Sequence, residues 1–178
     1  MKNVMLMIAA TACAVTSVLM AGPALASAGP SSHTLAVRAE LKAAIKTQLA
    51  YNPAGKVIDA NQISYDHGAV VVTLSVPGEH LSPDYTCPDH HFCFFQHPGL
   101  GGNGYEFNPA SYTAHHYYAL STWYPYALLG SVHNKWSHEI YISETRGSGG
   151  ANLCYPPGGT GSPNSALNWV WIGTGTSC

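Results

Sequence analysis

The chain has 178 residues, of which only 9% are charged, and its formal net charge at pH 7 is −2. From residue 81 onward two cations, Lys135 and Arg146, stand against five carboxylates. Binding to a nucleic-acid backbone needs several cations on one face, so the composition argues against a nucleic-acid partner.

The N-terminus has the three parts of an export signal. Lys2 supplies a positive start, residues 4–20 are almost uninterruptedly apolar, and Ala24-Leu25-Ala26 offers small residues for signal peptidase. A membrane anchor is the weaker alternative, because the apolar run is at the lower limit of spanning length and ends at Gly22-Pro23. We therefore predict a cleaved signal peptide over residues 1–26, a secreted, extracellular protein, and no transmembrane segment after cleavage.

A helix and a hairpin are expected next. Residues 27–33 have the Gly, Pro and Ser content of a flexible linker. Within residues 34–49 an apolar residue recurs every fourth position, which predicts an amphipathic helix: Val37, Leu41, Ile45 and Leu49. Strands are predicted at 56–59, 62–65 and 69–76, with a turn at 66–68. Residues 34–80 thus form a small α+β segment that could serve as a propeptide or as a docking subdomain.

The sequence pattern of residues 81–178 predicts a β domain. They show no useful helical periodicity, and short apolar runs alternate with Gly, Pro, Tyr and Trp, which is typical of short strands joined by turns. We expect strands at 92–96, 105–107, 131–134, 139–143, 152–155 and 168–172. The economical arrangement of these strands is a two-sheet sandwich.

Four cysteines remain once the signal is removed: Cys87, Cys93, Cys154 and Cys178. An even count in an exported chain predicts two disulfides, for which three pairings exist. The nearness of the first two cysteines in the sequence favours Cys87 with Cys93 and Cys154 with Cys178. A zinc site is the alternative, but it would need reduced thiolates and usually a Cys-x-x-Cys spacing.

Residues 87–107, CPDHHFCFFQHPGLGGNGYEF, resemble the opening Greek-key repeat of βγ-crystallin-like domains. They are most similar to a family of secreted bacterial peptidase inhibitors, related to metalloproteinase inhibitors, in which the repeat begins with Cys-Pro-x-x-x-Phe-Cys. Five residues match the fold-defining positions of this family: Phe95, Gly102, Tyr105, Phe107 and Ser131. Physically, a hairpin bent over its own sheet needs one position that tolerates positive φ, and Gly102 supplies it.

The resemblance implies a mainly β protein, a βγ-crystallin-like Greek-key sandwich preceded by the helix-plus-hairpin segment. It also implies a non-enzymatic function, inhibition of an extracellular protease through a disulfide-braced loop. Residues 99–104 and 146–150 are the candidate loops. The alternative is an extracellular binding or structural module that recognises cell-surface glycan or protein through an aromatic face. Candidate aromatics for that face, unless they form the core and rim of the sandwich, are Tyr112, Tyr117, Tyr118, Trp123, Tyr124 and Tyr126.

No metal site is predicted. Microbial βγ-crystallins bind calcium through two Asn or Asp residues shortly before the Ser, where this chain has Tyr126 and Ala127, which offer no oxygen ligand of that kind. Seven of the ten histidines lie beyond residue 81, and imidazole suits zinc, copper and nickel. Adjacent pairs such as His90-His91 would point to opposite faces of a strand, so solvated loop histidines are favoured over a metal site or a pH switch.

No catalytic residue is predicted either. The segment His138-Glu139 opens like a zinc-protease helix, but Ile142 stands where the second His is needed. Ser131 lacks the Gly-x-Ser-x-Gly elbow, and no free Cys remains as a nucleophile. The sequence therefore predicts a protein that is not an enzyme and has no cofactor.

Overall fold

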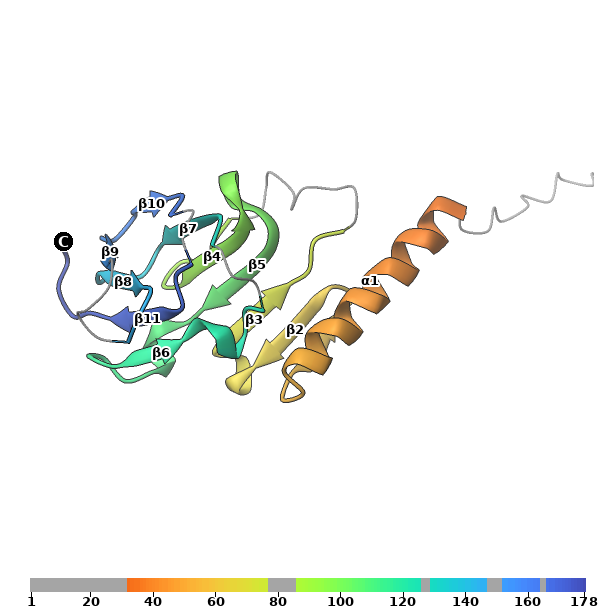
Figure 1. Ribbon diagram of the computed structural model, residues 1–178, viewed down its shortest axis with the longest axis horizontal. Helices are drawn as coiled ribbons and strands as arrows, with labels where there is room; N and C mark the ends of the chain where they lie inside the picture. Colours follow the sequence, from red (N-terminus) through yellow and green to blue (C-terminus); the bar gives the residue numbers. More distant parts are fainter. Residues whose placement is uncertain (1–31, 77–85, 126–128, 147–151, 164–165) are drawn as a thin grey trace, which may run out of the picture.

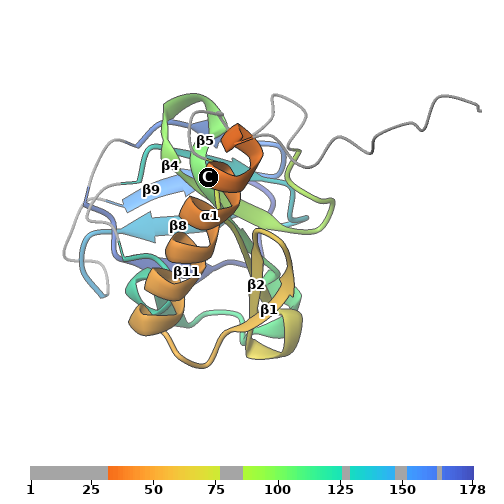
Figure 2. The same ribbon diagram turned by 90° about the vertical axis from the view of Figure 1, so that its right-hand side faces the viewer.

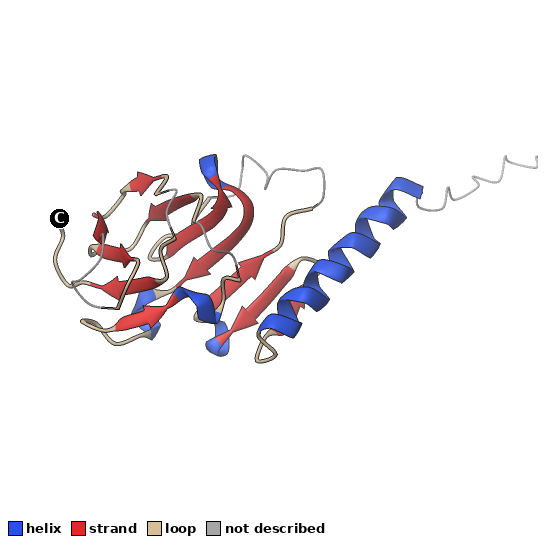
Figure 3. Ribbon diagram, in the orientation of Figure 1, coloured by secondary structure: helices blue, strands red, loops and turns tan. Residues whose placement is uncertain are grey.

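The computed structural model describes residues 32–76, 86–125, 129–146, 152–163 and 166–178 (Figure 1). Within these ranges it has eleven strands in two antiparallel sheets and one long helix, joined by short 3-10 turns (Figure 3). The prediction of a mainly β protein is confirmed. The predicted signal peptide and residues 27–31 of the predicted linker lie outside the described residues.

The N-terminal segment folds as a helix followed by three strands. Helix α1 (Ser32–Tyr51) packs Leu41 into the core, and β1 (Lys56–Asp59), β2 (Gln62–Tyr65) and β3 (Val70–Thr73) form an antiparallel meander. The helix lies beside β2, at the end of the molecule opposite the C-terminus (Figure 1). Viewed from that end, the helix runs obliquely beside the hairpin of β1 and β2 (Figure 2).

The following eight strands fall into two successive units of four. The first unit contains β4 (Phe92–His97), β5 (Gly101–Phe107), β6 (Tyr117–Ala119) and β7 (Ser131–Asn134). The second contains β8 (Ile140–Ser143), β9 (Asn152–Tyr155), β10 (Thr160–Gly161) and β11 (Trp169–Ile172). All six strands predicted for this region are present, and β6 and β10 are additional.

The two units exchange one strand each. The seven-stranded sheet has the order β1-β2-β3-β5-β4-β7-β10, and the four-stranded sheet has the order β6-β11-β8-β9. In each unit the fourth strand returns to pair with the first, while the third strand joins the sheet of the other unit. Each sheet therefore contains strands of both units.

The core lies between the inner faces of the sheets and continues under α1. At its centre the ring of Phe94 stacks on Tyr105 with centroids 5.0 Å apart, and Tyr124 meets both rings edge-on. Strand β4 is buried on its other face as well, where Cys93 and Phe95 pack against Cys87. This second cluster explains why the first four residues of β4 are all apolar and buried.

The N-terminal segment is joined to the rest of the fold through β3. Four residue pairs connect β3 with β5, from Val70 opposite Phe107 to Thr73 opposite Gly104. The buried Gln48 side chain of α1 donates a hydrogen bond of 2.9 Å to the carbonyl oxygen of Trp123. Sheet, core and helix are thus continuous across the two segments. None of the described helices is long and apolar enough to cross a membrane.

Candidate functional site: a clamped loop between β4 and β5

Residues 97–101 form a tight loop at the bend of the β4–β5 hairpin, whereas residues 101–104 of the expected 99–104 loop belong to strand β5. His97, Pro98 and Gly99 are exposed to solvent, and Gly99 and Leu100 both have positive φ, 69° and 63°. The hairpin register shifts between Phe95 and His97, so the loop turns away from the plane of the sheet. A left-handed backbone costs a residue such as Leu100 about 1–3 kcal/mol, so contacts around the loop must hold it in place.

The start of β7 fixes both ends of this loop from behind. The Ser131 hydroxyl donates to the carbonyl oxygen of His97 at 2.7 Å and accepts from the Leu100 amide at 2.9 Å. The amide of Gly130 donates to the carbonyl oxygen of Phe95 at 2.9 Å. A Cβ atom on Gly130 would lie 2.2 Å from the carbonyl carbon of His97, so only glycine fits between the two backbones.

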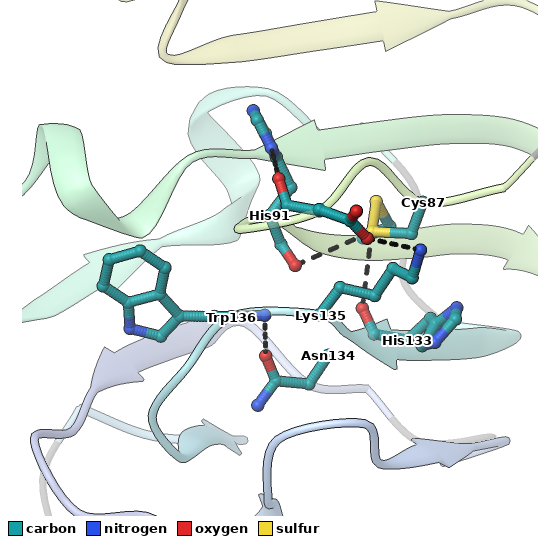
Figure 4. Close-up of a disulfide and its surroundings, with 8 residues drawn as sticks. Cys87, His91, His133, Asn134, Lys135 and Trp136 are labelled. Carbon is teal, nitrogen blue, oxygen red and sulfur yellow. Dashed lines mark hydrogen bonds and ion pairs between the residues drawn. A yellow bond between two sulfur atoms is a disulfide. The ribbon is translucent and has the colours of Figure 1, made fainter.

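The base of the loop rests on the first disulfide. The structure forms Cys87–Cys93 and Cys154–Cys178, the pairing that the sequence favoured. Phe95 is fully buried between Cys87, Cys93 and the side chain of Leu100. The Cys87 sulfur also lies 3.7 Å from the carbonyl oxygens of His91 and His133 (Figure 4), close contacts in which the oxidised sulfur has no proton to donate.

An exposed ion pair borders this disulfide. The Lys135 ammonium group lies 2.7 Å from a carboxylate oxygen of Asp89, on the segment between the two cysteines. The ammonium group lowers the pKa of the Asp89 carboxyl, first through the hydrogen bond and then through its charge. An exposed pair of this kind contributes little to stability, so the disulfide and Ser131 are the main constraints on the loop.

The other predicted site residues take structural positions. Tyr105 and Phe107 lie in the main core, and Gly102 has a φ of 74° just after the loop. Of the second candidate loop, 146–150, only Arg146 is described. Tyr126 and Ala127, the positions considered for calcium, lie outside the described residues.

The aromatic residues that the sequence suggested for a binding surface are divided between core and surface. Trp123 and Tyr124 are buried in the main core, and Tyr112 and Tyr118 pack against it half-buried. Four partly buried rings instead gather on the outer side of the smaller sheet: Tyr117, Tyr141, Trp169 and Trp171. Of these only Tyr117 was among the candidates, because the sequence does not show which strands lie beside β11.

The histidines do not converge. Among the described residues no group of three or more His, Cys, Asp and Glu side chains is placed to hold a metal ion. His90, His97, His115 and His116 are exposed, whereas burial and the nearby Lys135 hold the pKa of His133 below its usual range. Glu139, the acid of the protease-like segment, is buried just before β8.

Comparison with known proteins found no match to any family model, to any curated protein or to any solved structure.

Proposed function

We propose that this protein is a secreted, non-enzymatic peptidase inhibitor of the βγ-crystallin-like family, which presents the 97–101 loop to an extracellular protease. The observation that carries the proposal is the clamp by Ser131. One hydroxyl holds both ends of an exposed loop, through the carbonyl oxygen of His97 and the amide of Leu100.

The strand connections support the family part of the proposal. A Greek key has four antiparallel strands whose fourth member returns to lie beside the first. The pairs β4 with β7 and β8 with β11 have this relation, once in each unit. The Cys-Pro-x-x-x-Phe-Cys start of the first unit is the feature through which the sequence resembles the inhibitor family.

The loop has physical properties that suit an inhibitor. A segment already fixed in its bound conformation avoids about 0.5–1.5 kcal/mol of ordering cost for each side chain that would otherwise be immobilised. Pro98 restricts φ, and Gly99 leaves the backbone open to close approach, since nothing lies within 4 Å of the position that a Cβ atom would occupy there. The two disulfides are compatible with an extracellular site of action.

The test is a titration of oxidised protein, residues 27–178, against metallo-, serine and cysteine proteases. We expect stoichiometric inhibition of one class. Ser131→Ala should weaken inhibition and let the protease cut within residues 97–101. The matched control is Ser143→Ala, because Ser143 is also a buried strand serine and donates to a backbone carbonyl, that of Thr145, at 2.8 Å.

Three results would refute the proposal. The first is a wild-type protein that inhibits none of the three classes, and the second is one that is digested rapidly. The third is an inhibitor whose potency falls equally in Ser131→Ala and Ser143→Ala, because that result would place the contact surface elsewhere.

A further inference from the structure

The outer side of the smaller sheet carries a row of aromatic side chains. Strand β11 reads Trp-Val-Trp-Ile, and its Val170 and Ile172 are buried while Trp169 and Trp171 are only partly buried. The register places Tyr117 of β6 and Tyr141 of β8 directly opposite Trp171, one on each side. We call Tyr117, Tyr141, Trp169 and Trp171 the aromatic face.

Three of the four rings are in contact, with Trp171 at the centre. The Trp171 ring centroid lies 5.0 Å from that of Tyr141 and 6.5 Å from that of Tyr117. Strand spacing makes this row about 10 Å wide, and Trp169 extends it by about 7 Å along β11. At the borders His115 packs edge-on against Trp171 at 5.4 Å, and the Arg146 guanidinium lies 5.9 Å from the Trp169 ring.

This composition is unusual for a solvated sheet face, which ordinarily carries polar side chains. The two tyrosine hydroxyls of the aromatic face make no hydrogen bond to another described residue, and neither indole N–H is buried. Trp123 and Trp136, by contrast, have buried indole nitrogens. The aromatic face therefore combines apolar ring surface with hydroxyl and indole groups that have no partner among the residues that the structure describes.

Charge and size narrow the choice of ligand. None of the three strands that carry the face contains a charged residue, so it lacks the cationic groove that single-stranded nucleic acid requires. The aromatic face has four residues, whereas a stable protein interface contains about 20–30 residues a side. Sugar rings need less area, and their flat C–H faces and hydroxyl groups match aromatic rings with free polar atoms.

We propose that the aromatic face binds a neutral polysaccharide, with sugar rings lying against Trp169 and Trp171 and their hydroxyl groups bonding to Tyr117 and Tyr141. The site is separate from the 97–101 loop, so it would hold the protein on a glycan surface independently of any protease. It goes beyond inhibition and does not depend on it.

The test measures depletion of oxidised protein, residues 27–178, by insoluble cellulose and insoluble chitin, with sedimentation velocity of the same samples. We expect saturable binding to at least one polysaccharide. Trp171→Thr should weaken it by about tenfold or more, as expected for the loss of one aromatic contact. Trp136→Phe is the matched control, since Trp136 lies outside the aromatic face and packs partly buried against the core.

A melting temperature close to that of wild type would show that Trp171→Thr still folds. If Trp171→Thr does not fold, Tyr141→Phe replaces it in the assay; this variant removes only the hydroxyl group, so we expect a smaller loss of binding. Absence of binding to both polysaccharides would overturn the proposal, as would equal binding by Trp171→Thr and wild type. So would a dimer that Trp171→Thr dissociates, because the occupant of the face would then be a second copy of the chain. Protease inhibition should be unchanged in Trp171→Thr, which separates this proposal from the previous one.

Discussion

Alanine substitutions at Gly130 and at Gly99 should lower the free energy of unfolding by different amounts, for different physical reasons. A Cβ atom at Gly130 would lie 2.2 Å from the carbonyl carbon of His97 and 2.6 Å from the carbonyl oxygen of Gln96. These are backbone atoms, and the hydrogen bonds of Gly130 and Ser131 keep the two segments together. Gly99 has open space around it, and its only obstacle is a φ of 69°.

The magnitudes follow from these two geometries. Overpacking against a fixed neighbour costs about 1–3 kcal/mol and sometimes more, and we place Gly130→Ala at about 3 kcal/mol or above. A left-handed backbone costs an alanine about 1–2 kcal/mol, which applies to Gly99→Ala. For a chain of this size each kcal/mol lowers the melting temperature by about 2–4 °C.

The assay is thermal unfolding of the oxidised proteins at pH 7, followed by circular dichroism, with urea unfolding to obtain the free energy. We expect Gly130→Ala to lower the melting temperature clearly more than Gly99→Ala does. A Gly130→Ala variant as stable as Gly99→Ala would refute the reasoning, because it would mean that β7 does not lie against the loop.

Four further outcomes are expected. Tyr112→Phe should lower the free energy of unfolding by about 1 kcal/mol in urea, since it removes the hydrogen bond of 2.7 Å from the Tyr112 hydroxyl to the Asp66 carboxylate. Cys178→Ser should lower it by about 3 kcal/mol on the chain-entropy estimate, because the Cys154–Cys178 bridge closes a loop with a sequence separation of 24. The pKa of His133 is lower in the folded protein than its unfolded value of 6.5, so the stability that the neutral side chain contributes above pH 6.5 is lost as pH falls through the folded pKa. His133→Gln should therefore lose less stability than wild type between pH 7 and pH 5, as measured by urea unfolding at each pH. A chain cut between residues 76 and 86 should still elute from a sizing column as one species.

The sequence predicts the strands that have distinct boundaries. Strands β7 and β9 have the predicted bounds because Gly130 and Pro156 interrupt the chain beside them. Strands β6 and β10 have three and two residues, which is too short for any periodicity to appear. They exist because β11 and β7 offer partners across the exchanged sheets, and this pairing is a property of the tertiary structure.

The two candidate surfaces differ in how much of them could be foreseen. The position of the loop could be predicted in part, because Gly102 and Ser131 occupy positions that the family resemblance identifies. The aromatic face could not be predicted in full. Alternation in β11 places two Trp side chains on one side of the strand, but only the fold brings Tyr117 and Tyr141 beside them. Gln48 was missed for a similar reason: it looks like a solvated helix residue until its partner, the carbonyl oxygen of Trp123, is known.

The prediction for the cut chain tests whether the N-terminal segment could act as a removable propeptide. Both disulfides lie within residues 87–178, so no covalent bond would hold residues 32–76 after cleavage. The segment nevertheless supplies five almost fully buried core residues: Ile63, Tyr65, Val70, Val72 and Leu74.

Burying an apolar side chain of this size contributes about 1.5–3 kcal/mol. Without β3, strand β5 would also become a sheet edge beside the clamped loop, with unpaired backbone groups. A protease site inserted within residues 77–85 would allow the test, in which two bands on a denaturing gel should come from a single peak on the sizing column. Separate elution of the two pieces, with residues 86–178 still folded, would show instead that the segment is dispensable and would favour the propeptide role.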